Sequence, residues 1–111
     1  MSSAIDPPLL SEVLPSLVHE LEELLMKRGE PELAAQVSGL RILDRCRCGD
    51  DFCGMFYVRS KPKGSYGPNH RNVSLSPKEG MLILDIVDGR IASVEALYRD
   101  DIRKSIDALI S

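Results

Sequence analysis

The chain has 111 residues, of which 43% are hydrophobic and 28% charged, a composition typical of one globular domain and unlike that of a disordered chain. No apolar run is as long as a membrane span, and residues 1–6 lack the basic and apolar segments of a secretory signal. We therefore expect a cytoplasmic protein without a membrane partner, in which three cysteines do not form a disulfide framework.

The net charge of −3 is unevenly distributed along the chain. Residues 1–40 carry seven acids and two bases, residues 41–79 carry eight bases and four acids, and residues 80–111 carry six acids and four bases. A basic middle segment can be a ligand surface, but charges that pair within the fold explain it better. Because no nucleic-acid-binding module is recognisable in this acidic chain, nucleic acid is not an expected partner.

The first third of the chain has a helical pattern. Five leucines recur every three or four residues, which is typical of one face of a helix. Pro15 predicts a kink or a new helix start, and Pro31 predicts a short second helix that continues to Val37. The five leucines are Leu10, Leu14, Leu17, Leu21 and Leu24.

From residue 40 the hydrophobic period changes from that of a helix to two, which predicts a strand over 40–48. A turn follows at 49–51, and the chain returns in a second strand over 53–59. Residues 60–72 are rich in Pro, Gly, Ser and Asn and predict a long loop, of a length that is often functional. Val73 and Leu75 predict a short strand, and residues 76–79 resemble a capped helical turn.

Asp88-Gly89 lies between two apolar runs and predicts a β-hairpin, because a type I′ turn needs positive φ at both central residues. A regular hairpin pairs Ile86 with Ile91, Leu84 with Ser93 and Ile83 with Val94. Both faces of this hairpin are largely apolar, so we expect helices, or a second subunit in a homodimer, to cover them.

A last helix is expected from Asp100. The predicted fold is therefore a single α+β domain over 1–111. Residues 1–38 form a helical segment, and residues 39–111 form a mainly antiparallel sheet of two hairpins, with a possible short strand, and the C-terminal helix.

Cys46, Cys48 and Cys53 form a C-x-C-x4-C cluster at the tip of the first predicted hairpin. Alternation in the strand places Cys46 and Cys48 on one face, and a symmetric turn places Cys53 across from Cys48 and Met55 across from Cys46. Zinc prefers four tetrahedral ligands, often thiolates and imidazoles, and His70 is the candidate for the fourth position.

Two other interpretations of the cysteines remain open. They are small buried hydrophobic side chains on a core-facing strand, which is a common role of free cysteine and the interpretation we favour. Alternatively, Cys48 and Cys53 form a redox pair or a disulfide, although a reactive thiol needs an electropositive setting.

The second candidate site is the predicted long loop, where Tyr66, His70, Arg71 and Asn72 lie close together in the sequence. Arg71 would bind a phosphate or carboxylate with its guanidinium fork, and His70 would transfer a proton near neutral pH. The alternative is that glycine and proline shape the loop while its polar side chains satisfy the backbone. No nucleophile motif, phosphate-binding loop or metalloenzyme signature is present.

Three segments together resemble a family of small uncharacterised bacterial proteins. They read CRCGDDFC over 46–53, YGPNHRN over 66–72 and MLILDIVDGRI over 81–91. The resemblance covers residues 40–110 and leaves the acidic N-terminal helix outside. It transfers no catalytic or binding residue and therefore implies no activity.

Three hypotheses for the function follow from the sequence. The leading one is a non-enzymatic interaction or regulatory module that binds a protein partner, comparable by analogy alone with immunity-type proteins. The second is a zinc-binding domain that uses the cysteine-rich hairpin. The third is a phosphate- or nucleotide-binding protein, or an enzyme, centred on the loop from Tyr66 to Asn72.

Overall fold

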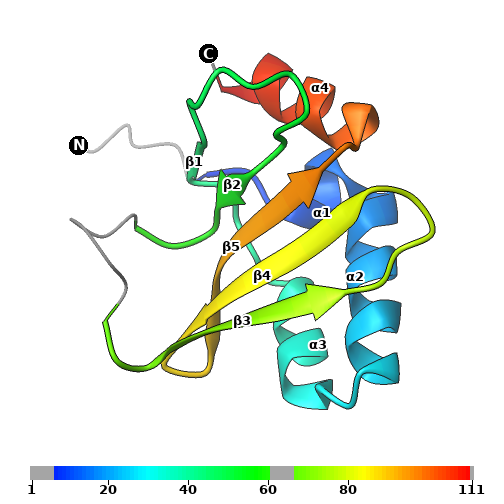
Figure 1. Cartoon of the computed structure of the whole chain (residues 1–111), viewed down its shortest axis with the longest axis vertical. Helices are drawn as coiled ribbons and strands as arrows, with labels where there is room; N and C mark the ends of the chain where they lie inside the picture. The colour runs from blue at the N-terminus through cyan, green and yellow to red at the C-terminus, as the bar shows by residue number, and fades with distance from the viewer. Residues whose placement is uncertain (1–6, 61–66, 111) are drawn as a thin grey trace, which may run out of the picture.

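The computed structural model describes residues 7–60 and 67–110, which form four helices and one five-stranded antiparallel sheet, confirming the predicted α+β class (Figure 1). The strand order is β1-β2-β5-β4-β3. The helices are α1 (Leu10–Val13), α2 (Pro15–Lys27), α3 (Pro31–Val37) and α4 (Asp100–Leu109). The strands are β1 (Asp44–Arg45), β2 (Phe56–Tyr57), β3 (His70–Leu75), β4 (Met81–Val87) and β5 (Arg90–Leu97).

The N-terminal helices begin where proline predicts. Pro15 is the first residue of α2 and Pro31 the first residue of α3, because proline lacks the N–H that the first helical turn leaves unpaired. Gly29, with φ +81, follows α2 in the left-handed conformation that favours glycine. Two helix breaks predicted from single residues are thus confirmed.

One face of the sheet packs against these helices and forms the core with them. Fully buried leucines of α2, such as Leu21 and Leu25, join Leu82 and Leu84 of β4 in a single hydrophobic cluster. Gln36 of α3 fastens the helices to the hairpin turn, because its amide donates to the Gly89 carbonyl at 2.9 Å and accepts from the Ile91 N–H at 3.0 Å. None of the helices formed by the described residues is both long and apolar enough to cross a bilayer.

The hairpin of β4 and β5 has the predicted turn but a different register. Asp88 (φ 52) and Gly89 (φ 77) both have positive φ, and Ile86 pairs with Ile91 as predicted. The predicted Leu84–Ser93 and Ile83–Val94 pairs are wrong, because a β-bulge shifts the register between Asp85 and Ile86. Beyond the bulge the strands pair as Asp85–Ser93, Leu84–Val94 and Ile83–Glu95.

The bulge has a physical reason in the hydrophobic pattern of β5. A one-residue change of register moves every following side chain to the other face of the strand. With the bulge, Val94 and Ala96 lie beside Leu84 and Leu82 in the core. The hydroxyl of Ser93 then lies on the opposite face of the sheet from this core, beside Asp85.

Four local predictions are wrong. Strands β1 and β2 cover two residues each rather than 40–48 and 53–59, and residues 76–79 are not helical. Residues 70–72 belong to β3 rather than to the predicted loop, because they pair with Val87, Ile86 and Asp85 of β4. Pairing with a neighbouring strand, which the local sequence does not specify, decides where this loop ends.

Charged side chains from the basic middle segment pair with acids from the two acidic ends. Arg71 donates to both carboxylate oxygens of Glu30, at 2.9 and 3.1 Å. Arg45 lies 3.4 Å from Asp107 of α4 and donates to the Ile110 carbonyl at 2.6 Å. Pairing within the fold therefore accounts for much of the charge segregation in the sequence.

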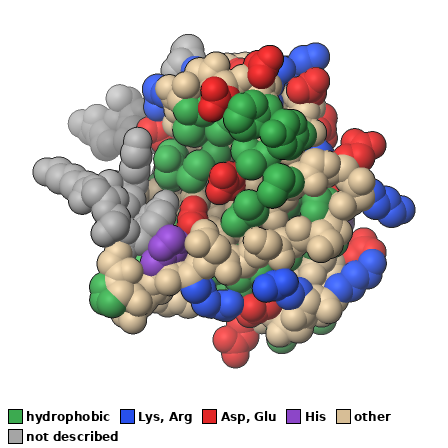
Figure 2. Space-filling view, viewed as in Figure 1, with side chains coloured by type: hydrophobic (Ala, Val, Ile, Leu, Met, Phe, Trp, Pro, Cys, Tyr) green, Lys and Arg blue, Asp and Glu red, His purple; other side chains and the backbone are tan. Residues whose placement is uncertain are grey.

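The second face of the sheet is not covered by α2 and α3. Figure 2 shows hydrophobic side chains gathered in the upper part of the view, with acidic side chains among them. Exposed large hydrophobic residues of the described chain include Phe52, Met81 and Tyr98. Phe52 belongs to the cysteine hairpin, and Tyr98 contacts it, since the Tyr98 N–H donates to the Phe52 carbonyl at 2.9 Å.

Candidate metal centre

The cysteine hairpin lies at one end of the sheet, between β1 and β2. Its strands continue the antiparallel pairing past Arg45–Phe56, since the Cys46 N–H donates to the Met55 carbonyl at 2.9 Å. Cys46 therefore lies across from Met55, as predicted. The turn closes with the Cys53 N–H, which donates to the Asp50 carbonyl at 3.3 Å.

The returning arm of the hairpin is fixed against β5 and α4. Cys53 forms an isolated bridge with Leu97, and the Gly54 N–H donates to the Ala96 carbonyl at 2.7 Å. A Cβ at Gly54 would lie 3.0 Å from that carbonyl oxygen and 3.3 Å from the backbone of Arg103. The absence of a side chain at Gly54 thus permits the close approach that positions Cys53.

The three cysteine sulfurs converge. The Sγ atoms of Cys46, Cys48 and Cys53 all lie within 4.8 Å of one another, and all three are free thiols. In a tetrahedral zinc–thiolate site with Zn–S distances near 2.3 Å, neighbouring sulfurs are about 3.8 Å apart. The observed separations of at most 4.8 Å are compatible with such a site. The group can therefore hold a metal ion.

The burial of the cysteines contradicts the interpretation that they are core side chains. Cys48 is exposed, and Cys46 and Cys53 are half-buried, so none of the three belongs to the hydrophobic core. The alternating pattern placed them correctly on one side of the hairpin but did not show that this side faces solvent. A metal ion or a solute can reach at least the Cys48 sulfur.

Burial raises the pKa of the Cys53 thiol to about 12, from an ordinary value of 9.0. Loss of hydration is the largest cause, and hydrogen bonds with the Cys48 and Cys46 thiols act in the same direction, while a backbone hydrogen bond at Met55 opposes them. Cys53 is therefore a thiol at neutral pH and a poor nucleophile. A metal ion that binds there must displace a proton.

His70 is not part of this group, and its predicted role as a fourth ligand is wrong. His70 pairs with Val87, next to the Asp88-Gly89 turn, whereas Cys53 bridges Leu97 at the other end of β5. Seven residues of extended strand separate these ends by about 20 Å. Among residues 7–60 and 67–110, no fourth His, Cys, Asp or Glu side chain joins the three cysteines.

The residues of the second predicted site do not converge on an anion. His70 Nε2 lies 2.7 Å from Asp85 Oδ1, and the Asn72 amide donates to the same oxygen at 2.6 Å. Arg71 lies on the opposite face of β3, where it pairs with Glu30. Tyr66 lies outside the described residues. A buried carboxylate at the centre of this cluster disfavours a bound phosphate.

Asp85 is the residue of this cluster that the sequence analysis missed. Its side chain is about nine-tenths buried, and its Oδ2 accepts from the Ser93 hydroxyl at 2.5 Å. Glu95 lies close enough for the Asp85 charge to add to the effect of burial, and together they raise the pKa of Glu95. The sequence does contain a signal for the contact between Asp85 and Ser93. The alternation of apolar residues is broken after Ile91, which indicates a bulge.

Comparisons with models of protein families, with curated proteins and with solved structures found no match. The function of this chain must therefore be inferred from its own geometry. Of the two sites predicted from the sequence, the cysteine hairpin is compatible with a metal ion. In the other, His70 and Asn72 contact Asp85, whereas Arg71 lies on the opposite face of β3.

Proposed function

We propose that the hairpin formed by 44–57 is a zinc-binding site and that Cys46, Cys48 and Cys53 are its ligands. The observation that supports this proposal is the convergence of three sulfurs within 4.8 Å. Sulfur ligands favour soft or borderline metals such as zinc and copper(I) over magnesium and calcium, which prefer oxygen. The convergent thiols thus define the class of metal.

The site has three protein ligands, because no fourth donor side chain of the described residues lies with them. A tetrahedral ion held there keeps one position for water or for a donor from another molecule. Three thiolates also donate much charge to the ion and weaken it as a Lewis acid. The proposed role of zinc is therefore to fix the hairpin rather than to activate water for hydrolysis.

The test is the metal content of the purified protein, measured by native mass spectrometry, followed by titration of the metal-free protein with cobalt(II). Cobalt bound to thiolates gives a charge-transfer absorption that reports directly on sulfur ligation. We expect one metal ion per chain and loss of the band in a Cys46→Ser, Cys48→Ser double variant. The matched control is Asp50→Asn, which changes a charge in the same turn without removing a sulfur.

Failure to bind zinc, cobalt(II) or copper(I) in the wild-type protein would refute the proposal. Equal metal affinity in the double cysteine variant and in the wild type would refute the choice of ligands. Retention of copper(I) without zinc would refute zinc as the metal.

A further inference from the structure

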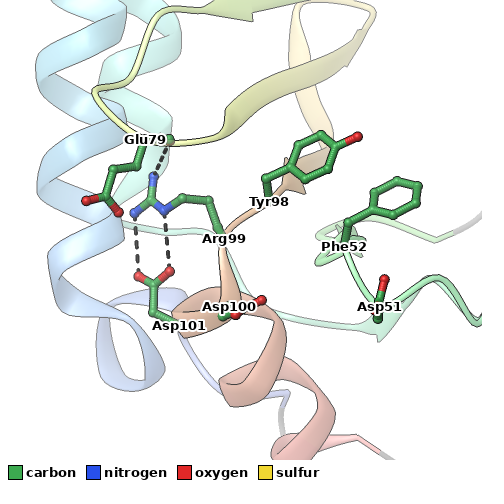
Figure 3. Close-up of a pocket in the computed structure, with 7 residues that line it drawn as sticks. All are labelled: Asp51, Phe52, Glu79, Tyr98, Arg99, Asp100 and Asp101. Atoms are coloured by element: carbon green, nitrogen blue, oxygen red, sulfur yellow. Dashed lines mark hydrogen bonds and ion pairs between the residues drawn. The ribbon is translucent and has the colours of Figure 1, made fainter.

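A cavity of about 810 Å³ lies beside the cysteine hairpin, where β5 joins α4 (Figure 3). It includes no cysteine, so it is distinct from the proposed metal site. Its lining combines two aromatic rings, four carboxylates and one arginine, which come from the hairpin tip, the segment before β4 and the start of α4. These residues are Asp51, Phe52, Glu79, Tyr98, Arg99, Asp100 and Asp101.

The two aromatic rings form an exposed stack at this cavity. The Phe52 and Tyr98 ring centroids are 5.2 Å apart with an angle of 19° between the planes. Tyr98 is 62% exposed and Phe52 37% exposed, although the Tyr98 N–H donates to the Phe52 carbonyl at 2.9 Å. Large aromatic side chains left in solvent are typical of interfaces, where a partner buries them.

The backbone at Tyr98 supports a role for its ring outside the fold. Tyr98 has φ +59, a left-handed conformation that is unfavourable for a bulky residue and that Gly or Asn adopts readily. Since most of the ring lies in solvent, packing in the core does not explain why a tyrosine stands there. The exposed part of the ring is available to a ligand.

The charge of the cavity is negative. Arg99 is neutralised, because its guanidinium donates to both oxygens of Glu20 at 2.9 and 2.8 Å and also contacts Asp101 at 3.3 Å. Within the described part of the chain, the salt bridges at this cavity join Arg99 to Glu20 and Asp101, and Arg103 to Asp100. None of them includes Asp51 or Glu79. Figure 3 shows the Asp51 side chain beside the Phe52 ring. The cavity therefore offers aromatic faces and unpaired carboxylates together.

We infer that this cavity binds an arginine side chain carried on a basic segment of a partner protein. A guanidinium is planar, so it stacks on an aromatic face while its N–H groups donate to carboxylates such as Asp51. A phosphate-bearing partner such as a nucleic acid would be repelled by the same carboxylates. Aromatic rings at the cavity mouth add contact area for the polypeptide around the arginine.

The test uses three fluorescent peptides that differ only at two positions in a Gly-Ser background, which carry arginine, lysine or citrulline. Citrulline keeps the planar shape of arginine without its charge, and lysine keeps the charge without the plane. Binding to the full chain is measured by fluorescence polarisation at about 0.15 M salt. We expect the arginine peptide to bind at least about tenfold more tightly than the citrulline peptide, and more tightly than the lysine peptide.

Variants of the protein locate the binding site. Tyr98→Asn removes the ring at a position whose backbone suits asparagine, and Asp51→Asn removes one carboxylate, so each should weaken binding of the arginine peptide about five- to tenfold. Glu32→Gln on exposed α3 removes an equal charge far from the cavity and should leave binding unchanged. Circular dichroism of Tyr98→Asn checks that the fold persists.

Equal binding of the arginine and citrulline peptides, or of the arginine and lysine peptides, would overturn the inference. So would an equal effect of Glu32→Gln and Asp51→Asn, which would indicate attraction by net charge alone. Wild-type affinity in a folded Tyr98→Asn protein would also overturn it. These outcomes do not depend on the cysteines, so they are separate from the outcomes that test the metal site.

Discussion

The Cys53 thiol makes the proposed metal binding strongly dependent on pH. Its pKa of about 12 lies far above neutral, so Cys53 is protonated in the metal-free protein throughout the range from about pH 6 to 8. A metal ion must displace this proton in order to bind the sulfur. Each unit of pH then changes the apparent affinity tenfold for every proton released.

The expected magnitude follows from this one group. Between about pH 6 and pH 8 the apparent zinc affinity rises at least about 100-fold, which corresponds to about 2.7 kcal/mol at 1.36 kcal/mol per pH unit. The sign is fixed, since a ligand whose thiol pKa is raised binds metal more weakly as the pH falls.

The assay is a competition between the protein and a chromophoric zinc chelator whose own pH dependence is known, repeated at half-unit intervals of pH. Asp50→Asn, which retains all three sulfurs, should reproduce the wild-type slope, whereas Cys53→Ser should lose both affinity and the Cys53 contribution to the slope. If the zinc affinity does not depend on pH across this range, then zinc does not displace a proton from Cys53, and the assignment of Cys53 as a ligand is refuted.

Three further outcomes concern stability and can be measured by urea unfolding at neutral pH or across the alkaline range. Asp85→Ala should reduce the free energy of unfolding by about 3 kcal/mol. The change removes a buried acceptor of three hydrogen bonds and leaves the fully buried Ser93 hydroxyl without its partner. A reduction below about 1 kcal/mol would contradict this reasoning. Gly80→Ala should reduce the free energy of unfolding by at least about 1 kcal/mol more than Gly29→Ala does. Both glycines have positive φ, but only a Cβ at Gly80 would overlap the Leu97 carbonyl oxygen. Equal reductions would show that the surrounding backbone moves to relieve the overlap. The metal-free protein should lose stability as the pH rises from 9 towards 12, because the Cys53 thiol has the ordinary pKa of 9.0 in the unfolded chain and a pKa of about 12 in the folded protein. The Cys53→Ser variant should lose less stability over the same pH range.

Local chemistry in the sequence predicted much of the fold. Pro15, Pro31 and the Asp88-Gly89 turn act through their own backbone preferences, so their effects are visible without knowledge of the neighbours. The convergence of the cysteines also followed from strand alternation. The position of β2 beside β5 did not, because sheet order depends on contacts between segments that are distant in the chain.

The incorrect site predictions share one physical cause, which is strand pairing. His70 and Asn72 share a face because they are two residues apart on β3, and that face meets Asp85 only because β3 pairs with β4. The Ser93 hydroxyl reaches Asp85 only because of a bulge. Neither pairing nor bulge is fixed by residues within the loop where the site was predicted.

The pocket beside α4 was not predicted for a related reason. Phe52 and Tyr98 are 46 positions apart in the chain and meet through a backbone hydrogen bond between the hairpin tip and the end of β5. The sequence around Phe52 has no hydrophobic period that would predict an exposed ring at this position. The sequence signal for this pocket is Tyr98, because an aromatic residue at the junction between a predicted strand and a predicted helix is a candidate for exposure.

Phe52 lines the aromatic cavity, and Cys53, the next residue, supplies one sulfur of the proposed metal site. If a metal ion bound at Cys53 changes the affinity of the cavity for its ligand, the effect is reciprocal. Whatever factor bound zinc contributes to the affinity for an arginine peptide, that peptide must contribute to the affinity for zinc. A titration of either ligand at saturating and zero concentrations of the other therefore measures one coupling free energy, and the sign of that energy tells whether metal supply favours or opposes partner binding.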